Sequence, residues 1–149
     1  MKQKFIDYFG RIAEETARLS SAKKLQVGCV IVKDNRILSV GYNGTPSGWD
    51  NECEEVVPPN EWVDYEQQKT KPEVLHAEAN ALMKLAQSTE SSKDAIVFVT
   101  HTPCIECAKL IYQAGIKEVY YINEYNATKG CGQQFLEKAG VEVCQQKQQ

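Results

Sequence analysis

The stretch that decides the fold is His76-Ala77-Glu78, followed further along the chain by Pro103-Cys104-Ile105-Glu106-Cys107. A catalytic zinc ion usually keeps three protein ligands, such as one imidazole and two thiolates, and leaves the fourth position to water. Zinc lowers the pKa of that water to roughly 7, which makes it a nucleophile near neutral pH. A carboxylate close to the metal can then move protons without binding it. We therefore predict one zinc ion, held by His76, Cys104 and Cys107, with Glu78 as the catalytic acid and base.

Both groups of ligands are expected to open helices. Apolar residues recur at helical spacing over 77–86 and again over 107–114. Thr102 and Pro103 suit the cap and the first position of the second helix. Because a helix N-terminus favours negative charge, the two cysteines should be stabilised there as thiolates.

The two motifs indicate a catalytic zinc site only in combination. Cys-x-x-Cys alone is more often a redox pair, half of a structural zinc site or coincidence, and His-Ala-Glu alone is close to chance. Joined in this order, they match the His-x-Glu and Pro-Cys-x-x-Cys signature of zinc deaminases, in which the glutamate is not a ligand. A non-enzymatic zinc or nucleotide-binding module is the alternative, and it would need a fourth protein ligand in place of water.

Composition limits the remaining possibilities. With 149 residues, 42% hydrophobic and 25% charged, the chain fits a single domain, 1–149. It shows neither a signal-peptide pattern nor an apolar run long enough for a bilayer, so we expect no membrane contact and a cytoplasmic location, in the host if the chain is phage-encoded. A net charge of −3 and a pI near 5.5 argue against a nucleic acid polymer and favour a small nucleotide.

Six cysteines leave two interpretations open. In an oxidising compartment they could form three disulfides. In the reducing cytosol they would stay free, so that metal binding explains Cys104 and Cys107, while Cys29 lies within an apolar strand.

The remaining pattern predicts an α/β fold. Residues 2–19 have the spacing of an amphipathic helix, and 27–32 and 37–42 are apolar runs joined by a tight turn at Asp34-Asn35. Strands at 95–100 and 119–122 are separated by a helix, which favours parallel pairing. A helix at 132–139 and an edge strand at 141–144 complete a mixed five-stranded sheet sandwiched between helices.

An inserted loop region interrupts this pattern at about 45–75. It contains several prolines and seven acidic residues from Asp50 to Glu66. A segment of this length is usually functional or disordered, and 61–69 is a candidate short helix. Trp49, Trp62 and Tyr65 could cover a substrate or could anchor the loop by local packing.

Three further features carry a family resemblance. They are Gly41-Tyr42-Asn43-Gly44-Thr45-Pro46 after the second strand, Asn80 after the His-Ala-Glu motif, and Tyr125 after the fourth strand. With the zinc motifs, they resemble the cytidine and deoxycytidylate deaminase superfamily over about residues 5–143, and most closely its deoxycytidylate deaminases of phage or bacterial type. The resemblance implies a cytidine deaminase-like fold.

The resemblance also implies a reaction and a set of substrate contacts. The reaction is zinc-dependent hydrolysis of dCMP to dUMP and ammonia, with another cytidine or nucleobase deaminase as the nearest alternative. Asn43 would bind the sugar hydroxyl, the backbone of Ala77 the base, the carbonyl of Thr102 the leaving amine, and Tyr125 the nucleotide. Asn43 could equally be an ordinary turn asparagine.

Regulation is implied in the same way. Such enzymes are typically hexamers, activated by dCTP with Mg²⁺ and inhibited by dTTP, and we expect Lys24, Gly41, Tyr42, Asn43 and Gly44 to bind the effector. Glycines let backbone amides approach phosphate, and a lysine can pair with it. Some relatives hold a second, structural zinc, but the inserted region has no histidine, so we predict a single zinc ion.

Overall fold

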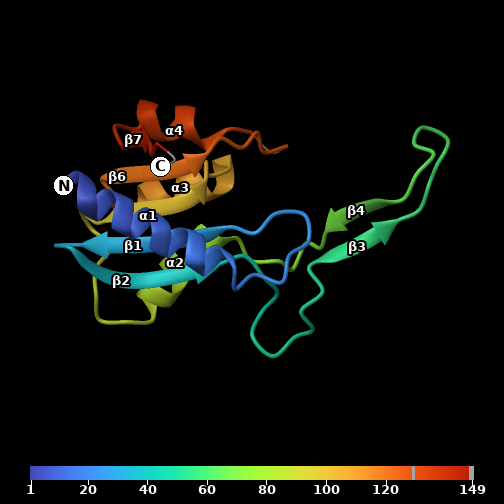
Figure 1. The fold of residues 1–149 in the computed structure, drawn as a ribbon, viewed down its shortest axis with the longest axis horizontal. Coiled ribbons are helices and arrows are strands. Elements are labelled where there is room, and N and C mark those ends of the chain that lie inside the picture. The colour runs from blue at the N-terminus through green and yellow to red at the C-terminus, as the bar shows by residue number, and fades with distance from the viewer. Residues whose placement is uncertain (129, 148–149) are drawn as a thin grey trace.

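A computed structural model describes residues 1–128 and 130–147 of the chain. Its body is a five-stranded sheet with strand order β2-β1-β5-β6-β7, covered by helices (Figure 1). In chain order, the elements of the body are α1 (Gln3–Ala17), β1 (Gly28–Lys33), β2 (Arg36–Tyr42), α2 (Ala77–Ala86), β5 (Ile96–His101), α3 (Ile105–Gln113), β6 (Glu118–Asn123), α4 (Gly132–Lys138) and β7 (Glu142–Gln145). The expected mixed sheet between helices is confirmed.

The β1–β2 hairpin forms where the sequence predicts it. The two strands pair antiparallel from Gly28 with Tyr42 to Lys33 with Arg36. Asp34 and Asn35 form the turn with φ values of 53° and 57°. Asp and Asn tolerate this left-handed conformation, and two such residues in succession match the twist of a hairpin.

The other half of the sheet is parallel. β5 pairs antiparallel with β1, whereas β6 runs parallel to β5, and β7 runs parallel to β6 at the edge. Parallel neighbours need a crossover, and α3 and α4 supply the two crossovers. The carboxyl ends of β5 and β6 therefore lie side by side, next to the start of α3.

Each face of the sheet has its own apolar core. On one face, Phe9 and Ala13 of α1 pack against Val30 and Phe98. On the other face, the buried side chains of α2, α3 and α4 pack against β1, β5 and β6. The two helices that carry the predicted metal ligands thus share one face of the sheet, as expected.

The start of α3 differs from the prediction. The helix begins at Ile105 with Cys104 as its N-cap, so Thr102 and Pro103 are neither its cap nor its first residue. The N–H of Thr102 instead donates to the carbonyl of Asn123 at the end of β6, which ties Thr102 to the sheet. His76 is likewise the N-cap of α2.

The inserted region forms a hairpin rather than a helix. β3 (Glu54–Val57) and β4 (Gln67–Thr70) pair antiparallel, so the prediction of a helix at 61–69 was wrong. We call residues 53–71 the arm; Figure 1 shows it extending away from the body of the protein. Backbone hydrogen bonds define β4, since all four of its side chains are exposed and show no apolar alternation.

The aromatic residues of the insertion do not anchor it. Trp49, Trp62 and Tyr65 are 59%, 86% and 62% exposed, so the alternative of local packing is wrong. None of the three lines the cavity described below. Within the described residues, no helix has both the length and the apolar character required to cross a bilayer.

Gly41 provides a test of how closely β2 packs on α2. A Cβ atom at this position would meet the carbonyl oxygen of Ala77 and would lie 2.5 Å from the backbone nitrogen of Ala81. Because both atoms belong to the backbone of α2, we expect Gly41→Ala to destabilise the protein by about 2–3 kcal/mol. Gly44→Ala is the matched control, since its nearest neighbour would be a ring carbon of Tyr42 at 3.9 Å. Equal thermal unfolding temperatures for the two variants would contradict this packing.

Candidate active site

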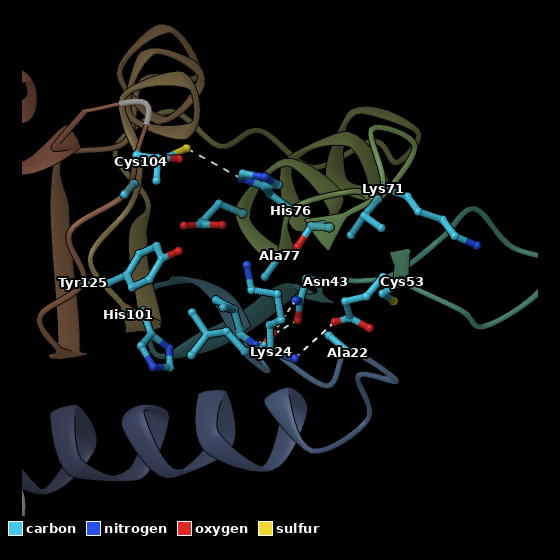
Figure 2. Close-up of a pocket in the computed structure, with 18 of the residues that line it drawn as sticks. Ala22, Lys24, Asn43, Cys53, Lys71, His76, Ala77, His101, Cys104 and Tyr125 are labelled. Atoms are coloured by element: carbon cyan, nitrogen blue, oxygen red, sulfur yellow. Dashed lines mark hydrogen bonds between the residues drawn. The ribbon is translucent and has the colours of Figure 1, made fainter. Parts of the chain in front are cut away.

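The predicted metal ligands lie together. The Nδ1 atom of His76 is 3.6 Å from the Sγ atom of Cys104 and 3.3 Å from that of Cys107. All three potential ligand atoms lie within 4.8 Å of one another. His76 and Cys104, which face each other in Figure 2, are the N-caps of α2 and α3, and Cys107 lies in the first turn of α3. Two helix starts on one face of the sheet thus form the cluster.

The donor set fits zinc. Two thiol sulfurs and one imidazole nitrogen are ligands typical of zinc, and three protein ligands leave one position open. Hydrogen bonding to Cys107 and His76 lowers the pKa of Cys104 to about 3. The pKa of Cys107 is raised, because its thiol hydrogen-bonds Cys104 and is buried. All six cysteines lie within the described residues, and each is a free thiol.

Glu78 is buried beside this cluster. It lies in the first turn of α2, its exposed fraction is 4%, and it lines the same cavity as His76 and Cys104. Burial raises the pKa of its carboxyl group, although its own backbone N–H and the nearby His76 partly oppose this rise. A carboxyl group of raised pKa, close to a metal site, is suited to take up and release a proton during catalysis.

The cluster opens into a cavity of about 500 Å³. Its volume lies in the range of pockets that enclose small ligands. The walls include the loop before β1, the residue after β2, the arm and the segment that follows it, the start of α2, and the residues at and after the ends of β5 and β6. Of the predicted substrate contacts, the cavity is lined by Asn43, Ala77, Thr102 and Tyr125.

The ends of β5 and β6 form one rigid wall. The N–H of Tyr125 donates to the Oγ1 atom of Thr102 at 2.6 Å, and the Thr102 hydroxyl lies 3.2 Å from the carbonyl of Tyr125. The ring of His101 meets that of Tyr125 edge to face at 6.3 Å. Burial lowers the pKa of His101, which favours its neutral form. This wall therefore offers an aromatic ring and fixed hydrogen-bonding groups.

Asn43 lies in the cavity but also holds the loop before β1. Its Oδ1 atom accepts the N–H of Val27, and its Nδ2 atom donates to the carbonyl of Leu25, both at 2.8 Å. The φ angle of Asn43 is not in the left-handed region, so Asn43 is not the left-handed turn asparagine considered as the alternative. One lone pair of the amide oxygen and one amide hydrogen are left for a ligand.

The rest of the segment 41–44 lies outside the cavity lining. Gly41 is buried against α2, and the carbonyl of Tyr42 accepts the side-chain amide of Asn80. The N–H of Gly44 donates to the carbonyl of Leu75, so this amide is already used within the chain. Of the five residues predicted to bind an effector, Lys24 and Asn43 line the cavity, whereas Gly41, Tyr42 and Gly44 do not.

The arm supplies cavity residues that the sequence analysis did not identify. They are Cys53, Glu54, Lys69, Thr70 and Lys71. The only available signal was charge, because Lys69 and Lys71 close an otherwise acidic insertion. His101, which no sequence motif marks, also lines the cavity.

Comparisons with known proteins agree with this geometry. Residues 3–123 match the family described as the cytidine and deoxycytidylate deaminase zinc-binding region. The deoxycytidylate deaminase of Schizosaccharomyces pombe is 37% identical over 140 residues, which is 93% of this chain but only 42% of the yeast protein. The deoxycytidylate deaminase of Enterobacteria phage T2 is 32% identical, with 89% of this chain and 87% of the phage protein covered.

Solved structures extend the match to the whole fold. The dCMP deaminase of cyanophage S-TIM5, crystallised in complex with dCMP and dUMP, superimposes with a TM-score of 0.84 and 43% identity, covering 99% of each chain. The same enzyme in its apo form gives a TM-score of 0.81. The expected cytidine deaminase-like fold is confirmed. With its sequence matched over most of its length and its ligand cluster in place, the chain belongs to the zinc-binding cytidine and deoxycytidylate deaminase family.

Proposed function

We propose that the protein catalyses the zinc-dependent hydrolysis of dCMP to dUMP and ammonia, in the cytoplasm. The observation that carries this proposal is the buried carboxyl group of Glu78 beside His76, Cys104 and Cys107, in a cavity that Glu78, His76 and Cys104 line. The similarity to the cyanophage enzyme, whose structure holds dCMP and dUMP, supports the choice of substrate.

The residues of the site divide the chemistry among them. A zinc ion bound by His76, Cys104 and Cys107 would supply Lewis-acid activation of the attacking water. Glu78 takes the two protons of the attacking water in turn, and delivers one to the ring nitrogen next to C4 and the other to the departing amine. A C–O bond forms at C4, the C–N bond breaks, and ammonia leaves. Because Glu78 is buried, its proton is not lost to bulk solvent during these transfers.

The walls of the cavity suit the rest of the nucleotide. We assign the backbone of Ala77 to the base, the carbonyl of Thr102 to the leaving amine, Asn43 to the sugar hydroxyl and Tyr125 to the nucleotide. All four residues line the cavity. The hydrogen bonds between Thr102 and Tyr125 fix their backbone before substrate binds, which reduces the ordering required on binding.

We further propose that dCTP with Mg²⁺ activates the enzyme and that dTTP inhibits it, in a hexamer. The support is that segment 41–44 contacts both the cavity and α2. Asn43 lines the cavity, while Gly41 and Tyr42 contact the helix that carries Glu78. A ligand that moved this segment would therefore affect both the cavity and the helix that carries Glu78.

A panel of substrates tests the reaction and its regulation together. Ammonia release is measured from dCMP, CMP, deoxycytidine and cytidine, with and without dCTP or dTTP. We expect dCMP to be preferred, and rates at subsaturating dCMP to rise with dCTP and fall with dTTP. Preference for a different nucleobase would replace the assigned substrate. Unchanged rates with both triphosphates would remove regulation and leave catalysis intact.

A further inference from the structure

The loop before β1, residues 20–27, is held at two separate points. On one side, the side chain of Asn43 bonds the backbone of Leu25 and Val27. On the other side, the Oε1 atom of Glu54 accepts the N–H groups of both Lys23 and Lys24, at 2.8 Å and 3.1 Å. The arm, which carries Glu54, therefore fixes the part of the loop that bears the two lysines.

Of these two lysines, only Lys24 lines the cavity. Figure 2 shows its side chain extending from the loop into the cavity, towards the side on which His76 and Ala77 lie. Lys24 makes no ion pair with any residue in 1–128 or 130–147. Lys71, by contrast, has its Nζ atom 3.8 Å from a carboxylate oxygen of Asp50.

The charged residues are unevenly distributed around the cavity. His76, Cys104 and Glu78 line the part of the cavity at the starts of α2 and α3, while Lys24, Lys69 and Lys71 line the parts formed by the loop and the arm. The Glu54 carboxylate accepts two backbone N–H groups, so it serves as an anchor of the loop. A ligand that places a neutral ring beside His76, Cys104 and Glu78 and an anion near Lys24 would match this distribution of charge.

We infer that Lys24 binds the 5′-phosphate of the substrate, and that the arm, through Glu54, holds Lys24 in position and so selects nucleotides over nucleosides. This inference rests on the proposed function. It assigns to catalysis a lysine that the sequence alone suggests for effector binding, and it gives the inserted arm a role. Glu54 is a positioning residue here, since it acts through the backbone of the loop.

The first test compares Lys24→Ala with Lys23→Ala, using the full zinc-loaded chain. Lys23 is the matched control, because it lies on the same loop and bonds Glu54 through its backbone but does not line the cavity. The ratio of kcat/KM for dCMP to that for deoxycytidine should fall about 10- to 100-fold in Lys24→Ala, mainly through KM for dCMP. The same ratio should stay within about twofold of wild type in Lys23→Ala.

A binding measurement gives the same information without turnover. Calorimetric titration with dUMP should show about 10- to 100-fold weaker binding to Lys24→Ala, and a weaker dependence of the dissociation constant on salt than in wild type. Zinc content and unfolding temperature, measured on the same samples, establish that the variant is folded.

Variants of Glu54 test the role of the arm. Glu54→Gln keeps an oxygen that can accept the two N–H groups, so it should retain most of the preference for dCMP. Glu54→Ala removes the acceptor and should reproduce the loss seen in Lys24→Ala. A structural defect alone would lower activity on dCMP and deoxycytidine equally.

The outcomes separate this inference from the proposed function. If wild-type protein releases no ammonia from dCMP, the proposed function fails. If wild type deaminates dCMP but Lys24→Ala keeps the wild-type substrate ratio and dUMP affinity, only the present inference is overturned. A change confined to the response to dCTP overturns it as well, and would return Lys24 to the effector site.

Discussion

Replacing Glu78 by glutamine should leave one zinc ion per chain and lower kcat for dCMP by about 100- to 10,000-fold. Glutamine has almost the same shape, but it cannot take a proton from the attacking water or return one to the base. Because Glu78 is not among the clustered ligand atoms, its loss should not release the metal. Zinc analysis and steady-state ammonia release on the same preparation check both parts of this expectation.

Glu106→Gln is the matched control for this experiment. Glu106 lies between the two cysteines in the first turn of α3, but its side chain is exposed and pairs with Lys109. The variant should keep wild-type activity, since exposed ion pairs of this kind contribute little. A Glu78→Gln enzyme with more than a tenth of wild-type kcat would remove Glu78 from the role of proton carrier.

Replacing Cys107 by alanine should abolish both zinc binding and detectable turnover. The substitution leaves one thiol and one imidazole, and two ligands hold zinc far more weakly than three. Cys107 is also 2% exposed, so the smaller side chain leaves a gap in the packing of α3 and should lower the unfolding temperature. Metal analysis after extensive dialysis, combined with thermal unfolding, measures these losses.

Cys131 provides the control for the second experiment. Its backbone pairs with that of Cys104, yet its thiol is exposed and is not one of the three clustered ligands. Cys131→Ala should therefore retain zinc and activity. Stoichiometric zinc in Cys107→Ala, or loss of zinc in Cys131→Ala, would show that the ligand set is different.

Local signals explain why the body of the fold could be predicted from the sequence. The bounds of α2 follow from apolar residues at helical spacing, and Asp34-Asn35 marks a turn whose geometry few other residues tolerate. The ligand cluster could be predicted for a similar reason. Its residue types and order are specific, and helix starts on one face of a sheet bring them together.

No local sequence pattern predicts the arm or the cavity walls formed by the arm and the loop before β1. β4 consists of exposed polar residues held by backbone pairing with β3, so neither helical nor strand periodicity marks it. The start of α3 was misplaced for a tertiary reason, because Thr102 is tied to the end of β6 rather than to the helix. The anchoring of Lys24 depends on Glu54, thirty residues away along the chain, and no local pattern reports such a contact.

The most direct test of the account is X-ray absorption at the zinc edge on the purified, ligand-free protein. We predict one zinc ion per chain with two sulfur neighbours at about 2.3 Å and two nitrogen or oxygen neighbours at about 2.0 Å. These neighbours correspond to the two cysteines, His76 and one water. A third sulfur neighbour, or a purified protein that deaminates dCMP without bound zinc, would contradict a catalytic metal site with an open position.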